Sequence, residues 1–164
     1  MINHLGQQLM IKATDARLLA YAWVSLYLIE LALRRRGFHD VVQRIETSVT
    51  PSQDTVTRRN MHRAQRYARR IEIAARYHPV CPRCLHRSLV LHQWLRGEGL
   101  PSQLQIGVVK SGSELKAHAW VNVGGYVVND HPESIRVFTP LAPAWRVNRS
   151  CCEARFDSQG PRWQ

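Results

Sequence analysis

The stretch His-Ala-Trp-Val at residues 118–121 decides which fold we predict for this chain. It lies in an alternating segment, residues 117–123, which is typical of a β-strand. A Gly-Gly pair follows and predicts a turn into a further strand that ends at Asp130. Upstream, the run Cys-Leu-His-Arg-Ser-Leu begins at Cys84 and reads as the start of an amphipathic helix. A thiol at a helix start, an imidazole on a strand and a carboxylate on the next strand are the parts of a cysteine hydrolase.

The surroundings of Cys84 favour a reactive thiol. Pro82 suits the first turn of a helix, because its missing N–H costs nothing there. Free N–H groups at a helix start, together with two nearby arginines, stabilise a thiolate. The backbone N–H of Cys84 is a candidate donor to a developing oxyanion, and the sequence identifies no second donor. His118 is the candidate proton acceptor and donor, and Trp120, on the same strand face, is expected to wall the site or simply to pack in the core.

The position of Asp130 depends on the length of the hairpin loop. Directly opposed residues of an antiparallel pair lie on the same face of the sheet. A two-residue turn at Gly124 and Gly125 would place Asp130 on the face opposite to His118. A three-residue loop, residues 123–125, would pair Asp130 with His118 and would need Gly125 at positive φ. We therefore predict the three-residue loop.

The rest of the chain predicts helices before Cys84 and strands after the helix that begins there. Thus the fold class is α+β, with N-terminal helices and a Cys-bearing helix packed on an antiparallel sheet. We expect a single domain, 1–164, made of a helical part (1–78), a catalytic core (79–139) and an irregular tail (140–164). The expected helices cover residues 15–36, 40–46, 54–77 and 84–97, and the expected strands 104–108, 117–123, 126–130 and 136–139.

Composition restricts the partners and the compartment. The net charge of +11 would attract an acidic partner, and many of the arginines fall in the expected helix 54–77. A solvated basic face and a nucleic-acid-binding module are alternative interpretations, although no zinc finger and no RNA-binding aromatic signature is present. Residues 18–33 are apolar but short for a membrane span, and Glu30 interrupts them. No secretory signal precedes them, so we expect a cytoplasmic protein with reduced thiols.

The cysteine spacing allows two further interpretations, a zinc site and a redox site. Cys81 and Cys84, with His86 and His92, have the types of side chain that zinc prefers. A second ligand pair at suitable spacing is missing, because the other two cysteines are adjacent. The same Cys-x-x-Cys pair does not follow a strand in a βαβ unit, as a redox motif would. We therefore expect neither a metal nor another cofactor, and Cys81 is most simply a bystander.

Five segments, taken together, resemble one family: the leader peptidases of lasso-peptide biosynthesis, often called B proteins. The order and spacing of the segments carry the resemblance, since the cysteine and His-Ala-Trp motifs also recur in other transglutaminase-like enzymes. The resemblance covers residues 79–139, whereas the helical part is similar only in character. The matching segments are 84–89 (Cys-Leu-His-Arg-Ser-Leu), 99–101 (Gly-Leu-Pro), 104–108 (Leu-Gln-Ile-Gly-Val), 117–121 (Ala-His-Ala-Trp-Val) and 128–130 (Val-Asn-Asp).

The resemblance implies a cysteine protease of transglutaminase-like, papain-like fold that removes the leader from a ribosomally made precursor. It implies Cys84 as nucleophile, His118 as general base and acid, and Asp130 as the group that orients His118. A cyclase would then close a macrolactam on the new N-terminus. Residues 1–78 lack the strands of a fused leader-recognition domain, so the chain resembles the split form, which depends on a separate recognition protein. A transglutaminase-like acyl transferase with the same triad remains an alternative.

Overall fold

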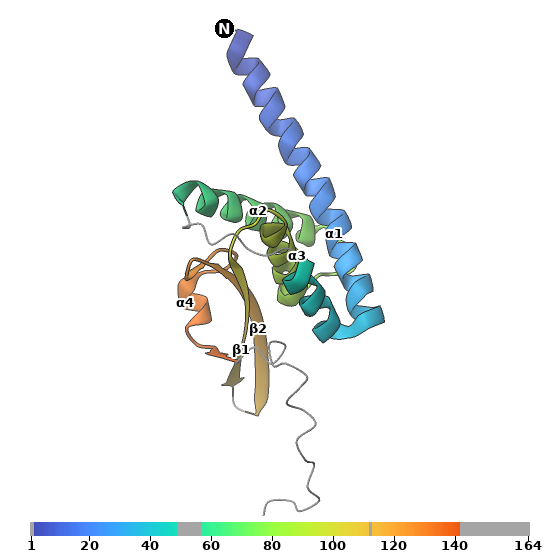
Figure 1. Cartoon of the computed structure of the whole chain (residues 1–164), viewed down its shortest axis with the longest axis vertical. Coiled ribbons are helices and arrows are strands. Elements are labelled where there is room, and N and C mark those ends of the chain that lie inside the picture. The colour runs from blue at the N-terminus through green and yellow to red at the C-terminus, as the bar shows by residue number, and fades with distance from the viewer. Residues whose placement is uncertain (1, 49–56, 112, 142–164) are drawn as a thin grey trace, which may run out of the picture.

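The computed structural model describes residues 2–48, 57–111 and 113–141, with side chains described from residue 15 onward. Three long helices precede a four-stranded antiparallel sheet of order β3-β2-β1-β4 (Figure 1). This arrangement confirms the predicted α+β class with a papain-like core. The elements are α1 (Ile2–Ser48), α2 (Arg58–Arg76), α3 (Cys84–Gly97), β1 (Ser102–Ser111), β2 (Glu114–Val123), β3 (Tyr126–Val127), α4 (Pro132–Ile135) and β4 (Thr139–Pro140).

α1 is longer than the sequence predicted. It begins at Ile2 and continues past Gly37, where the expected helix ended. At Gly37 the backbone leaves helical geometry (φ 78°, ψ 170°), so the expected helix 40–46 forms the part of α1 beyond a kink. Glycine tolerates this positive φ because it has no Cβ. One face of α1 enters the core through Ala22, Leu26 and Ile29.

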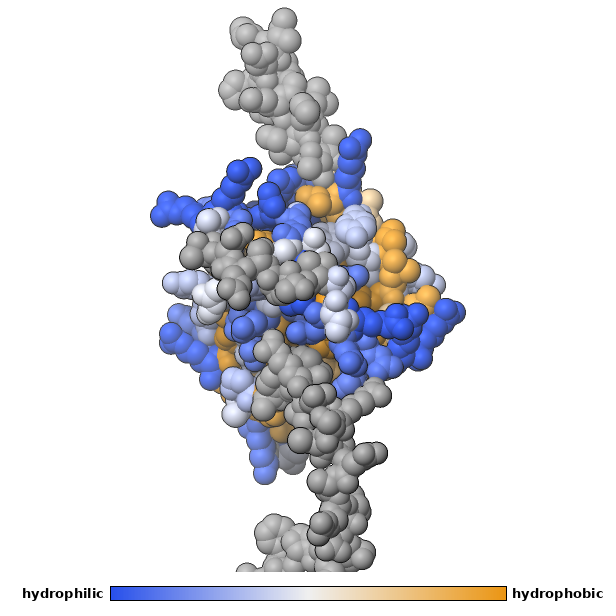
Figure 2. All heavy atoms as spheres, viewed as in Figure 1, coloured by the Kyte–Doolittle hydropathy of each residue, from blue (hydrophilic) through white to orange (hydrophobic). Residues whose placement is uncertain are grey.

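The other face of α1 is apolar and exposed. Figure 2 shows apolar surface on the right of the molecule, where α1 runs in Figure 1. By length and composition alone, residues 15–48 are apolar enough to cross a membrane, although the same helix packs on α2 and α3. The exposed large apolar side chains of α1 are Tyr21, Trp23, Val24, Tyr27 and Leu28.

α2 is capped by Thr57, whose hydroxyl oxygen accepts a hydrogen bond from the Asn60 amide at 3.3 Å. The expected start of this helix, before residue 57, lies outside the described residues. Ion pairs occupy part of its arginine face, between Arg63 and Glu98, between Arg66 and Asp15, and between Arg70 and Asp15. Tyr67 also donates to Glu98. Burial and then this hydrogen bond raise the pKa of Tyr67 to about 12.

α3 is the central helix and contacts α1, α2, β1 and β2. Its middle is largely buried, through Leu89, Val90, Leu91 and Leu95 among others, and Gln93 is the exposed residue there. Burying an aliphatic side chain of this size contributes roughly 1.5–3 kcal/mol. The helix that carries Cys84 is therefore fixed by the core of the protein.

The predicted three-residue hairpin loop is wrong. Val123 pairs with Tyr126, so the turn holds two residues, Gly124 (φ 57°) and Gly125 (φ 83°). Two successive residues at positive φ form the type I′ turn, whose twist matches that of the strands and which Gly-Gly adopts without strain.

The end of the described chain also differs from the prediction. The expected strand 126–130 pairs only as Tyr126–Val127. Of the expected strand 136–139, only Thr139 lies in a strand, the short β4, because a turn and a bend cover residues 136–138 after α4. β4 pairs with the middle of β1, where Val108 faces Thr139. Of the predicted tail, residues 142–164 lie outside the described part of the chain.

Candidate active site

One cavity of about 650 Å³ brings the three candidate catalytic residues together. It is lined by Cys84 at the start of α3, by His118 on β2 and by Asp130 in the segment after β3. α2 forms another part of the wall, with Glu72 among its lining residues. The sequence did not predict the contribution of α2.

Cys84 is the first residue of α3 and is half-buried, whereas Cys81 is exposed. Cys81 has a positive φ of 46°, which is uncommon for a residue with a side chain. The amide of Arg83, the N-cap, donates to His86 Nδ1 at 3.2 Å. The start of α3, and with it the thiol, is therefore held by a side chain of its own first turn.

A contact with α1 fixes the same helix start. His86 Nε2 lies 2.5 Å from a carboxylate oxygen of Glu30. Because His86 Nδ1 accepts a hydrogen bond from a backbone amide, Nε2 carries the proton and donates it to Glu30. A hydrogen bond from Arg34 and then the one from His86 lower the pKa of Glu30 and outweigh the opposing effect of its burial. Glu30 therefore stays a carboxylate and holds α3 to α1.

His118 is oriented by Asp130. His118 Nε2 and Asp130 Oδ2 are 2.5 Å apart, and both side chains are partly buried. The other carboxylate oxygen, Oδ1, accepts the amide of His131 at 2.7 Å. Because Nε2 is engaged by the carboxylate, Nδ1 is the nitrogen available to exchange a proton with a thiol.

Two aromatic rings flank the imidazole. The ring of Trp120 lies 6.2 Å from that of His118, centroid to centroid, and the ring of Phe138 lies 5.2 Å away. Trp120 is almost fully buried, so it packs in the core and walls His118 at once. Gly107 pairs with His118 across the β1–β2 ladder, where the ring of Trp120 leaves no room for a Cβ.

Asp130 reaches His118 although the loop has two residues, because the chain leaves the ladder before it. Val128 still donates its amide to the Val121 carbonyl at 3.0 Å. The return bond is missing, since the Val121 amide donates to the side chain of Asn129 at 2.8 Å. Strand alternation therefore stops at Val128 and no longer sets the face of Asp130.

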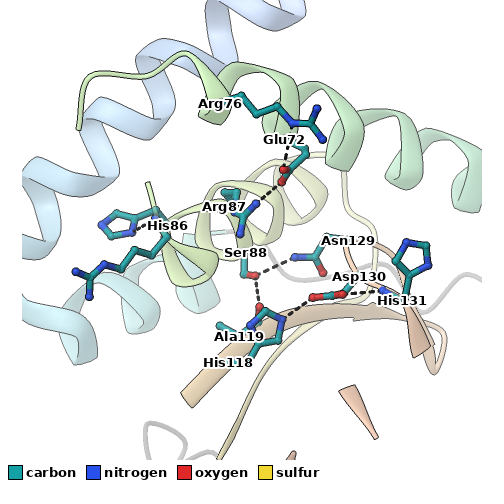
Figure 3. A network of polar contacts seen from close by, with 11 residues as sticks. Glu72, Arg76, His86, Arg87, Ser88, His118, Ala119, Asn129, Asp130 and His131 are labelled. Carbon is teal, nitrogen blue, oxygen red and sulfur yellow. Dashed lines mark hydrogen bonds and ion pairs between the residues drawn. The ribbon is translucent and has the colours of Figure 1, made fainter. Parts of the chain in front are cut away.

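Further polar groups lie around the site (Figure 3). Arg87, one turn into α3, donates to Glu72 of α2, and Arg76 lies 3.7 Å from the same carboxylate. Asn129 and Ser88 hydrogen-bond to each other. Ser88 lies four residues after Cys84, so its place on the Cys84 face was visible, whereas the α2 contacts are tertiary and leave no local signal. Within the described residues, no group of three or more His, Cys, Asp or Glu side chains is placed to hold a metal ion.

Comparison with known proteins supplies the family. The sequence model of the Transglutaminase-like superfamily matches residues 14–143, which include every candidate catalytic residue. No curated protein and no solved structure matches the chain. Members of this superfamily are typically cysteine proteases and acyltransferases. Because the match covers well over half of the chain, the protein belongs to the transglutaminase-like superfamily.

Proposed function

We propose that this chain is a cysteine endopeptidase that removes the leader from a ribosomally made lasso-peptide precursor. The observation that carries the proposal is the His118–Asp130 contact of 2.5 Å beside a helix-start thiol, Cys84, in one cavity. Membership of the transglutaminase-like superfamily supports thiol chemistry at this site. The narrower assignment rests on the resemblance of residues 79–139 to lasso-peptide leader peptidases.

The proposed reaction begins with proton transfer from the Cys84 thiol to His118 Nδ1. The thiolate attacks the last carbonyl of the leader, and N–H groups at the start of α3 stabilise the oxyanion. His118 then returns the proton to the leaving amine, which becomes the N-terminus of the released core peptide. Water hydrolyses the leader thioester with His118 as general base, while Asp130 keeps the imidazole in one tautomer.

The test is mass spectrometry of a candidate precursor incubated with the protein and with a leader-recognition protein. We expect the core peptide and the free leader acid, and neither with Cys84→Ala. An added primary amine separates peptidase from acyltransferase, because a transferase would convert the leader to its amide. An intact precursor under all conditions would contradict the proposal.

We also propose that the exposed apolar face of α1 docks the recognition protein. Five large apolar side chains crowd this face between Tyr21 and Leu28, which is more than scattered surface exposure. A cyclase that acts on the released core peptide is a further expected partner. Replacing Val24 and Leu28 by serine should raise the apparent KM for the precursor when the recognition protein is supplied, with turnover at saturation unchanged. Tyr21 is left in place because its ring stacks on Trp94 of α3 at 4.9 Å.

The arginine face of α2 is the second proposed dock, for the acidic part of the partner or leader. Arg63 and Arg66 are held in ion pairs, so their reversal would disturb the fold. Arg58 and Arg59 are exposed, and no ion pair within the described residues involves them. Reversing both to Glu also places acidic groups in the first turn of α2, where they favour the helix.

A matched control for this reversal is available on the sheet. Lys110 and Lys116 are exposed at the far end of the β1–β2 hairpin, and changing both to Glu alters the charge equally. A KM raised at low salt only by the α2 pair would support docking there. Equal effects of the two pairs would mean that only the net charge matters.

A further inference from the structure

Beyond Val128, two side chains make the hydrogen bonds to β2 that the backbone of a paired strand would otherwise make. The Val121 amide donates to Asn129 Oδ1 at 2.8 Å, and the Ala119 carbonyl accepts from Ser88 Oγ at 2.8 Å. In an antiparallel ladder, alternate residues direct their amide and carbonyl groups toward the same neighbouring strand. Both groups therefore belong to the β2 edge that faces β3, and side chains satisfy both.

The two side chains are also joined to each other. Asn129 Nδ2 donates to Ser88 Oγ at 2.9 Å (Figure 3). Ser88 is fully buried, and its single hydroxyl proton goes to the Ala119 carbonyl. The amide of Asn129 is therefore used at both ends, as an acceptor and as a donor. An aspartate at this position would keep only the acceptor, and a leucine would keep neither.

Each part of this unit adjoins a candidate catalytic residue. Ser88 lies one helical turn after Cys84, Asn129 directly precedes Asp130, and the carbonyl that Ser88 binds belongs to the residue after His118. We propose that Ser88 and Asn129 are positioning residues, which turn Asp130 toward His118 and hold α3 against β2. This inference deepens the proposed function and rests on it for its catalytic meaning.

The two-residue turn gives Asn129 a specific task. If the β3 ladder continued in its observed register, Ala119 would oppose Asp130, on the face opposite to His118. The Asn129 side chain occupies the Val121 amide and so blocks that continuation. Without it, the backbone carbonyl of Val128 is free to take the amide. Losing Asn129 therefore favours the register that removes Asp130 from the site.

The experiment follows alkylation of Cys84 by iodoacetamide as a function of pH, with the site identified by peptide mass mapping. The alkylation assay needs no precursor peptide. We expect a step in the wild-type profile that His118→Ala removes, and that Asp130→Ala and Asn129→Leu shift equally. Leader cleavage by Asn129→Leu should fall on the order of a hundredfold. Combining Asn129→Leu with Asp130→Ala should add little, and Asn129→Asp should fall between wild type and Asn129→Leu.

A second buried serine provides the control. Ser102, on β1, hydrogen-bonds His92 of α3 at 2.9 Å, away from the cavity. Ser88→Ala and Ser102→Ala should both lower the melting temperature, but only Ser88→Ala should shift the alkylation step. The inference would be overturned if Asn129→Leu showed the same alkylation step as the wild type. It would also be overturned if Ser102→Ala shifted the step as much as Ser88→Ala does.

The same assay separates this inference from the proposed function. If the step depends on His118 and Asn129 but no precursor is cleaved, the positioning role stands and the leader-peptidase assignment fails. If the wild type shows no step that depends on His118, both proposals are overturned.

Discussion

Replacing Gly107 by alanine should disturb the site although it changes none of the candidate catalytic residues. Gly107 pairs with His118 across β1 and β2. A Cβ at this position would lie 2.8 Å from Trp120 Cη2, 3.0 Å from Trp120 Cζ3 and 2.9 Å from Phe138 Cβ, whereas ordinary contacts begin near 3.4 Å. One obstacle is a buried ring and the other is an atom next to the backbone, so neither can swing aside. Both residues flank the imidazole of His118, and their displacement must move it.

The loss of folding stability in Gly107→Ala follows from the overpacking around the new Cβ. Forcing one extra carbon into a packed core destabilises by about 1–3 kcal/mol, which corresponds to a fall in melting temperature of roughly 2–12 °C for a chain of this size. Cleavage should fall together with stability, because His118 loses its flanking rings. The assays are thermal unfolding, which gives the melting temperature, and precursor cleavage at a temperature well below the transition.

Gly97 is the matched control, since a Cβ there meets nothing within 4 Å. Gly97→Ala, at the end of α3, should be neutral or stabilise by up to about 1 kcal/mol. A Gly107→Ala variant with an unchanged melting temperature and full activity would refute the packing argument.

Three further predictions concern single groups. Cys84→Ala should abolish cleavage with a small change in melting temperature, and Cys81→Ala should cost little; mass spectrometry of the products checks both. His118→Ala should be as damaging as Cys84→Ala, because members of the proposed triad would act as a unit, whereas Asp130→Asn should retain more kcat/KM. The pKa of Tyr67 is raised from 10.0 to about 12, so its contribution to stability is present below about pH 10 and is lost as the pH rises through 12. In an ultraviolet titration, Tyr67→Phe should remove the most alkaline tyrosine step.

Local patterns predicted the parts of the site that depend on neighbours in sequence. The start of α3 follows from Pro82 before Cys84, and the alternation around His118 follows from period two. The wall that α2 adds to the cavity could not be predicted, because Glu72 meets Arg87 only through helix packing. Local sequence could not predict the contact that anchors α3 either, since Glu30 is 56 residues from its partner, His86.

The length of α1 shows a different limit. Gly37 reads as a helix end, and it does leave helical geometry, but the chain resumes the helix at once. Residues beyond the kink, such as Val41 and Val42, are buried, so packing favours a second helical segment there. A glycine predicts that the backbone changes direction, whereas the core decides whether the helix resumes.

The position of Asp130 shows where counting along a strand fails. Alternation predicts the face of a side chain only while the backbone ladder continues. Here the ladder ends because Asn129, with an amide side chain that can imitate a peptide group, takes the hydrogen bond of Val121. The sequence signal was therefore not the length of the glycine turn but the asparagine directly before the carboxylate. Where a residue that can replace a backbone acceptor stands next to a candidate catalytic group, the register count should stop at that residue. The position of the catalytic candidate beyond that residue then depends on helix packing. Here α3 supplies Ser88, which hydrogen-bonds the asparagine that precedes Asp130.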